Sequence, residues 1–123
     1  MTSFRAVCTM QATASLASGA LMLTLPSPVL GVLALPSDPG TQIVARMLGG
    51  VLFALGATLL GVRDVEDRDA RTRVSLGNAT CDGCVAIVLV AALVTHLLGS
   101  LGWVLAVLFV SNAVSWLLAL RSK

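Results

Sequence analysis

The sequence predicts an all-α fold, a bundle of four transmembrane helices joined by short loops, and two observations lead to this prediction. The 123 residues are 57% hydrophobic and only 11% charged, with a mean hydropathy of +0.95, so the chain lacks the charged surface that a water-soluble domain needs. Four apolar stretches, about residues 5–25, 43–62, 74–98 and 101–120, are each long enough to cross a hydrocarbon core about 30 Å thick. A single membrane domain over residues 1–123 is therefore expected.

Local signals set the expected boundaries of these helices. Pro26 and Pro28 end the first helix, because proline has no amide hydrogen and restricts the residue before it. Residues 29–35 are then expected to form a short apolar segment at the membrane interface. Asp38 is the predicted N-cap of the second helix, with Pro39 as its first residue. The segment 63–73 mixes arginines with acidic residues, which is typical of a solvated loop or a helix extension.

The basic residues predict the orientation of the chain in the membrane. Seven of the eight lie on the same side of the four predicted spans: Arg5, Arg63, Arg68, Arg71, Arg73, Arg121 and Lys123. Basic residues are enriched on the cytoplasmic side of membrane proteins. Both termini are therefore expected in the cytoplasm, with the chain in the cell (inner or plasma) membrane. Arg46 is the exception, and its long side chain is expected to reach the outer interface.

A cleaved signal peptide is the competing interpretation of the first span. Arg5, an apolar run and the small residues from Ala17 to Ala20 resemble such a peptide. However, polar residues interrupt the run before that point, and stronger apolar residues follow it at positions 21–25. These features favour a retained first span. Cleavage would leave three spans and put the termini on opposite sides of the membrane.

Small residues four positions apart predict which helix faces pack against each other, because they let helix backbones approach closely in a membrane. Two sets show this spacing: Gly50 with Ala54 and Ala57 with Gly61 in the second span, and Ser111, Ser115 and Ala119 in the fourth. Trp103 and Trp116 lie near opposite ends of the fourth span, where tryptophans are expected in the two interfacial belts.

Polar residues deep in the spans are the candidate functional residues. Counted at 1.5 Å per residue, Asp82 and Asn112 lie at about the same depth, roughly 12 Å inside the cytoplasmic face, with Gln11 and Thr58 somewhat nearer that face. A carboxylate there costs several kcal/mol unless it is partnered or protonated. We therefore expect Asp82 to face the bundle interior in a hydrogen bond, with Asn112 as a candidate partner. The alternative is that Asp82 caps a helix that begins at Gly83.

Cys81-Asp82-Gly83-Cys84 resembles the CxxC layout of the DsbB and vitamin K epoxide reductase class of quinone-linked thiol oxidants. Those enzymes need an active disulfide near the oxidising outer face, whereas these cysteines fall in the predicted cytoplasmic half, where thiols stay reduced. Cys8 is the only other cysteine, so the second external pair of such relays is missing. His96 is about 18 Å further along the helix. No metal and no cofactor are therefore predicted, and His96 is interpreted as a polar residue near the outer interface.

Several features resemble the small bacterial four-helix membrane proteins, in particular those of the DoxX type. They are the segment from Ala45 to Gly50 that opens the second helix, the charged loop after Gly61-Val62-Arg63, a polar entry to the third helix and an asparagine in the fourth. The resemblance implies the four-helix fold and carries over no catalytic residue. The first span has no acidic residue, which argues against a small multidrug exporter. The glycine- and asparagine-rich signatures and the phenylalanine track of fluoride channels are missing, which argues against that class as well.

The pattern favours a non-enzymatic accessory or scaffold protein, or a bundle that binds an apolar ligand. The expected partners are membrane lipid and either another membrane protein or a second copy of the chain. Nucleic acid is not expected, because no basic patch contains interleaved aromatic residues. The alternative is a small proton-coupled transporter or membrane enzyme that uses the polar layer around Asp82. A third hypothesis, less favoured, is a thiol oxidoreductase that acts through Cys81 and Cys84.

Overall fold

The computed structural model describes residues 3–97, 99 and 101–120, and all the regular structure in these residues is helical. The helices are α1 (Phe4–Thr24), α2 (Pro26–Val32), α3 (Pro39–Val62), α4 (Arg68–Val94) and α5 (Leu101–Ala119). Four of them, all but the short α2, are long and apolar enough to cross a membrane. The predicted all-α fold with four membrane-spanning helices is therefore confirmed.

Capping residues begin three of the long helices. Ser3 caps α1 by accepting a hydrogen bond from the Ala6 amide at 3.2 Å. Asp38 accepts hydrogen bonds from the amides of Gly40 and Thr41, at 3.0 and 3.1 Å, as predicted for an N-cap. The hydrogen bond from the Thr41 side chain has the largest effect on the Asp38 carboxyl and lowers its pKa below the ordinary value. The hydrogen bond from the Thr41 amide lowers this pKa further. Asp67 caps α4 by accepting a hydrogen bond from the Ala70 amide at 2.8 Å.

The third span differs from its predicted range at both ends. Because the Asp67 cap lies before position 74, α4 begins at Arg68 and includes part of the charged segment as a helix extension. It ends at Val94, because His96 has a left-handed backbone with φ of 57°. The helix therefore starts before the predicted span of 74–98 and ends before position 98, and Leu98 itself lies outside the described residues.

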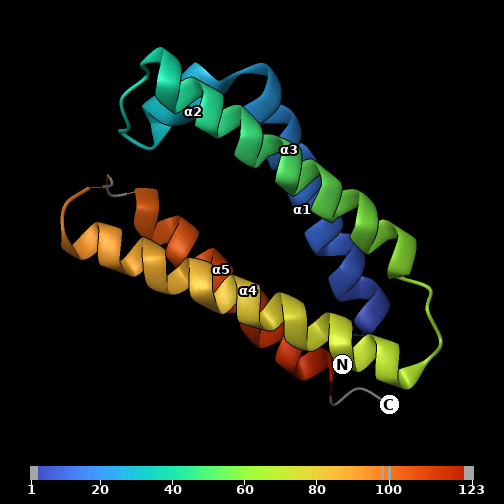
Figure 1. Cartoon of the computed structure of the whole chain (residues 1–123). Helices are drawn as coiled ribbons and strands as arrows, with labels where there is room; N and C mark the ends of the chain where they lie inside the picture. The colour runs from blue at the N-terminus through green and yellow to red at the C-terminus, as the bar shows by residue number, and fades with distance from the viewer. Residues whose placement is uncertain (1–2, 98, 100, 121–123) are drawn as a thin grey trace.

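The four long helices form two antiparallel hairpins, α1 with α3 and α4 with α5, and most contacts between helices lie within these two pairs. Figure 1 shows the hairpins close together near the start of α1 and diverging from there toward α2. We call the end that holds the start of α1, the α3–α4 loop and the end of α5 the basic end. At the opposite end, the Gly99 amide lies 3.5 Å from the Leu33 carbonyl oxygen.

Glycines bring α1 and α3 into backbone contact. A Cβ at Gly19 would lie 2.7 Å from the Gly49 carbonyl oxygen, and one at Gly56 would lie 2.9 Å from the Ala12 carbonyl oxygen. By contrast, a Cβ at Gly50 or Gly61 would meet nothing within 4 Å. The predicted stripe on the second span was therefore wrong: Ala54 and Ala57 are exposed, and the face that packs carries Ala45, Gly49, Gly56 and Leu59.

The prediction for the fourth span holds only in part. Ala119 is buried, whereas Ser115 is half-buried and Ser111 is exposed. The Ser115 hydroxyl donates to the Ser111 carbonyl of its own helix at 2.8 Å. The packed face of α5 therefore includes Ala119, as predicted, but does not include Ser111.

All four long helices contribute to one core at the basic end. Its buried residues are Phe4, Val7, Cys8 and Ala12 from α1, Leu59 from α3, Ala79 from α4, and Trp116 and Ala119 from α5. Elsewhere the long helices expose large apolar side chains, among them Ile87 at 71% and Met47 at 68% exposure. Such a surface is stable against lipid rather than water, so this chain is a multi-pass membrane protein.

Candidate functional site

Three buried polar side chains join the two hairpins, and we call Gln11, Asp82 and Trp116 the polar cluster. The Gln11 amide nitrogen donates to the Asp82 carboxylate, 3.1 Å from Oδ2 and 3.3 Å from Oδ1. The Trp116 indole N–H donates to Gln11 Oε1. Gln11 lies on α1, Asp82 on α4 and Trp116 on α5, so these hydrogen bonds cross from one hairpin to the other.

The chemistry of the two partners explains why a glutamine lies between them. An indole N–H is only a donor, and an ionised carboxylate is only an acceptor. The amide of Gln11 provides an acceptor oxygen for Trp116 and donor hydrogens for Asp82, so its orientation follows from its neighbours. Among the described residues, every fully enclosed side-chain nitrogen or oxygen has a hydrogen-bond partner. The polar cluster is therefore internally satisfied, as a membrane interior requires.

Phe4 and Arg71 pack beside the polar cluster, on the side that faces the basic end. The rings of Phe4 and Trp116 pack edge to face with their centroids 6.1 Å apart, a favoured arrangement for aromatic pairs. The guanidinium of Arg71 lies 5.6 Å from the centroid of the Phe4 ring, within cation–π range. Arg71 Nε also donates to the Val65 carbonyl at 2.6 Å. These contacts tie the start of α4 to α1 and α5.

The structure brings together only part of the predicted polar layer. Asp82 lies in the middle of α4 with 3% exposure, so it faces the interior as expected and does not cap a helix that begins at Gly83. Its partner is Gln11 rather than Asn112, which is half-buried and makes no side-chain hydrogen bond to a described residue. Thr58 is exposed and donates to the Ala54 carbonyl of its own helix at 2.9 Å.

The candidate outer-face residues, Arg46 in the first half of α3 and His96 just after α4, both lie toward the end opposite the basic end and are both exposed. His96 follows α4 with its left-handed backbone, a conformation that ends the helix. Neither side chain forms an ion pair or a hydrogen bond with a described residue. The structure therefore does not bring Arg46 and His96 to the polar cluster.

The three cysteines are free thiols that do not form one site. Cys8 is buried in the core at the basic end, whereas Cys81 and Cys84 are exposed on α4. In the described part of the chain, no three His, Cys, Asp or Glu side chains are close enough to hold a metal ion.

Trp116 was predicted in an interfacial belt, and that prediction was wrong. Its side chain is completely buried, whereas Trp103, at 52% exposure, retains a surface position. The sequence contains one signal for this burial: Trp116 follows Asn112 by four residues and so lies on the same face of α5. Phe4, Gln11 and Gly19 likewise recur at helical spacing along the buried face of α1.

A comparison of the chain with protein-family models, curated proteins and solved structures finds no match. The resemblance to DoxX-type proteins therefore stays a prediction from the sequence.

Proposed function

We propose that this chain is a non-enzymatic accessory or scaffold protein of the membrane, in which the polar cluster fixes how the two hairpins meet. The observation that supports this proposal is the pairing of Gln11 with both Asp82 and Trp116 across the hairpins. A satisfied buried polar network rigidifies the core and specifies one packing arrangement. Its proposed partners are membrane lipid and other membrane proteins, or a second copy of the chain.

The hydroxyl and amide groups outside the polar cluster support the same role. Thr58, Asn78 and Ser115 each donate to a carbonyl of their own helix. These bonds satisfy side chains that would be costly to leave unpaired in a membrane. None of them places a base beside a nucleophile, which covalent catalysis requires.

A proton-coupled transporter or membrane enzyme is the second candidate, and one observation favours it. Asp82 is a buried carboxylate within a membrane span, and no described basic side chain lies within ion-pair distance of it. Acidic residues in such positions are often proton carriers.

Proton flux in liposomes distinguishes the two candidates. Wild-type protein and Asp82→Asn are reconstituted with an entrapped pH-sensitive dye, and a potassium gradient with valinomycin supplies the driving force. An accessory protein should give the same proton leak in both variants, because the amide oxygen of the substituted side chain can still accept a hydrogen bond from Gln11. Native mass spectrometry should also show the same co-purifying lipids and proteins for both variants. A wild-type flux that disappears in Asp82→Asn would overturn the accessory role in favour of proton transport.

The proposed location is the cell (inner or plasma) membrane with both termini in the cytoplasm, because the basic end carries Arg5 and the arginines of the segment 63–73. Arg121 and Lys123, which contribute to the same expectation, lie outside the described residues. Terminal fusions to alkaline phosphatase should be inactive and terminal fusions to a cytoplasmic fluorescent protein should be bright. Active alkaline phosphatase at either terminus would refute this orientation.

A further inference from the structure

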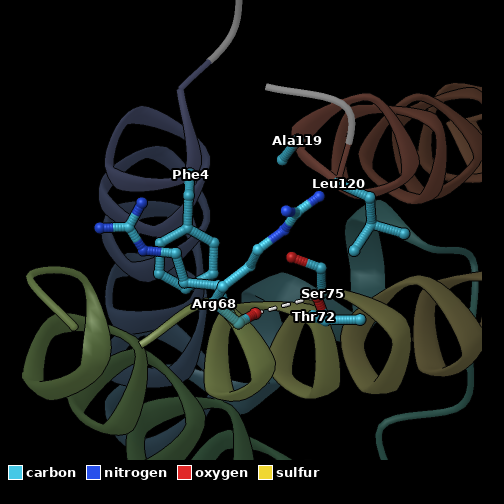
Figure 2. A pocket seen from close by; sticks show the side chains of 7 residues that line it. Phe4, Arg68, Thr72, Ser75, Ala119 and Leu120 are labelled. Atoms are coloured by element: carbon cyan, nitrogen blue, oxygen red, sulfur yellow. Dashed lines mark hydrogen bonds between the residues drawn. The ribbon is translucent and has the colours of Figure 1, made fainter. Parts of the chain in front are cut away.

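A cavity of about 350 Å³ opens at the basic end, outside the polar cluster. It lies between the start of α1, the first two turns of α4 and the end of α5 (Figure 2). Its lining residues are Phe4, Arg68, Arg71, Thr72, Ser75, Ala119 and Leu120. The lining therefore combines two guanidinium groups and two hydroxyls with an apolar wall.

The charge of this lining is positive. Among the described residues no acidic side chain lines the cavity, and the Asp64 carboxylate pairs with Arg5 and Arg63 at 3.1 and 3.2 Å. Arg71 uses Nε for the Val65 carbonyl, which leaves its terminal nitrogens available. Arg68 has no ion pair with a described residue. A guanidinium group binds phosphate well, because two of its N–H groups can donate to two phosphate oxygens at the same time.

Ser75 provides a second, independent sign of a ligand. The residue is 1% exposed, yet its hydroxyl has no hydrogen-bond partner among the described residues. Figure 2 shows this hydroxyl directed into the cavity. The neighbouring Thr72 hydroxyl instead donates to the Arg68 carbonyl at 2.9 Å. Since every fully enclosed side-chain oxygen in the described part of the chain has a partner, the Ser75 oxygen is open to the cavity. A hydroxyl of a buried residue that faces a cavity without a protein partner is suited to bind a ligand oxygen.

The position of the cavity matches the depth of lipid head groups. α4 has 27 residues, so it is about 40 Å long and exceeds a hydrocarbon core of about 30 Å. Its first turns, which carry Arg68, Arg71 and Ser75, therefore extend toward the interface. Basic pockets between membrane helices at this depth bind anionic head groups.

We propose that this cavity binds a phosphate group, with Arg68, Arg71 and the Ser75 hydroxyl as its donors and with Phe4 and Leu120 against the apolar part of the ligand. The phosphate belongs either to the head group of an anionic phospholipid or to a small soluble phosphate. This proposal does not depend on the accessory role, since Asp82 and Gln11 are outside the cavity.

Native mass spectrometry of delipidated protein, titrated with phosphatidylglycerol, tests the proposal. We expect Arg68→Gln and Ser75→Ala each to weaken binding of the first lipid about fivefold to tenfold, because each removes a hydrogen bond to a charged group. Arg73→Gln is the matched control: it removes the same charge from the same helix, but Arg73 is exposed and does not line the cavity. Its affinity should stay within about twofold of the wild type. Circular dichroism would confirm that all variants are folded.

Two further measurements assign the source of the phosphate. Inorganic phosphate that displaces phosphatidylglycerol from the wild type at millimolar concentration would indicate a soluble phosphate ligand. Lack of competition, together with weaker binding of zwitterionic phosphatidylcholine, would indicate the lipid head group. Equal losses in Arg68→Gln and Arg73→Gln would overturn the proposal, because they would show attraction to a diffuse basic surface. Unchanged binding in both Arg68→Gln and Ser75→Ala would overturn it as well.

Discussion

Trp116→Ala is expected to destabilise the folded protein by about 3 to 5 kcal/mol, the usual cost of truncating a buried tryptophan. The side chain is completely buried at the junction of the two hairpins, where it packs against Phe4 and donates to Gln11. Truncation would therefore leave a cavity and remove the partner of the Gln11 oxygen, and the contact between α1 and α5 would be lost. Unfolding in mixed detergent micelles titrated with sodium dodecyl sulfate, followed by circular dichroism, measures this loss.

Trp103→Ala is the control for that experiment, because it makes the same chemical change on the same helix. Trp103 is 52% exposed, so its truncation should change the free energy of unfolding by about 0.5 kcal/mol or less. Similar losses for the two variants would show that Trp116 is an interfacial residue and that the junction is misplaced.

Gly49→Ala is expected to destabilise the α1–α3 hairpin by about 1 to 3 kcal/mol, the usual cost of overpacking a tight contact. The new Cβ would lie 2.8 Å from Met22 Cβ and 2.9 Å from the Gly19 carbonyl oxygen. The second of these neighbours is backbone, so the two helices would have to move apart. The same unfolding experiment measures the effect.

Gly50→Ala is the matched control one position along the same helix. A Cβ there meets nothing within 4 Å, so the substitution should leave stability unchanged or raise it by up to about 1 kcal/mol through better helix propensity. The reverse order, with Gly50→Ala as the damaging change, would support the stripe of small residues that the sequence predicted and contradict the packing described above.

The helix boundaries that were predicted correctly are those set by residues close to them in the sequence. The Asp38 cap and the break at Pro26 were correct because capping and proline geometry act within a few residues. The start of α4 was left open between a loop and a helix extension, because the cap at Asp67 lies inside a charged segment on which hydropathy gives no information. Hydropathy identifies where a helix can enter lipid, and a helix can extend beyond that point into water.

Contacts between helices were harder to predict, because several faces of an apolar span have a similar composition and the sequence does not show which of them packs. Gly50 and Ala54 have the spacing of a packing stripe, but the face that turns inward is the one that meets Gly19 of α1. Trp116 is another example, since its burial depends on Phe4 and Gln11 from the other end of the chain. Depth counting correctly placed Asp82 in the interior but wrongly indicated Asn112 as its partner instead of Gln11, because rotation about the helix axis, which depth does not specify, is set by packing.

A double-mutant cycle on Gln11→Ala and Asp82→Ala tests whether a hydrogen bond between these residues joins the two hairpins. Measured by the same unfolding titration, the pair should show a coupling free energy of about 0.6 to 1.7 kcal/mol, the range from average to maximum for hydrogen bonds between membrane helices. The parallel cycle on Asn112→Ala and Asp82→Ala should be additive. Additivity in the first cycle with coupling in the second would contradict the account and make Asn112 the partner of Asp82.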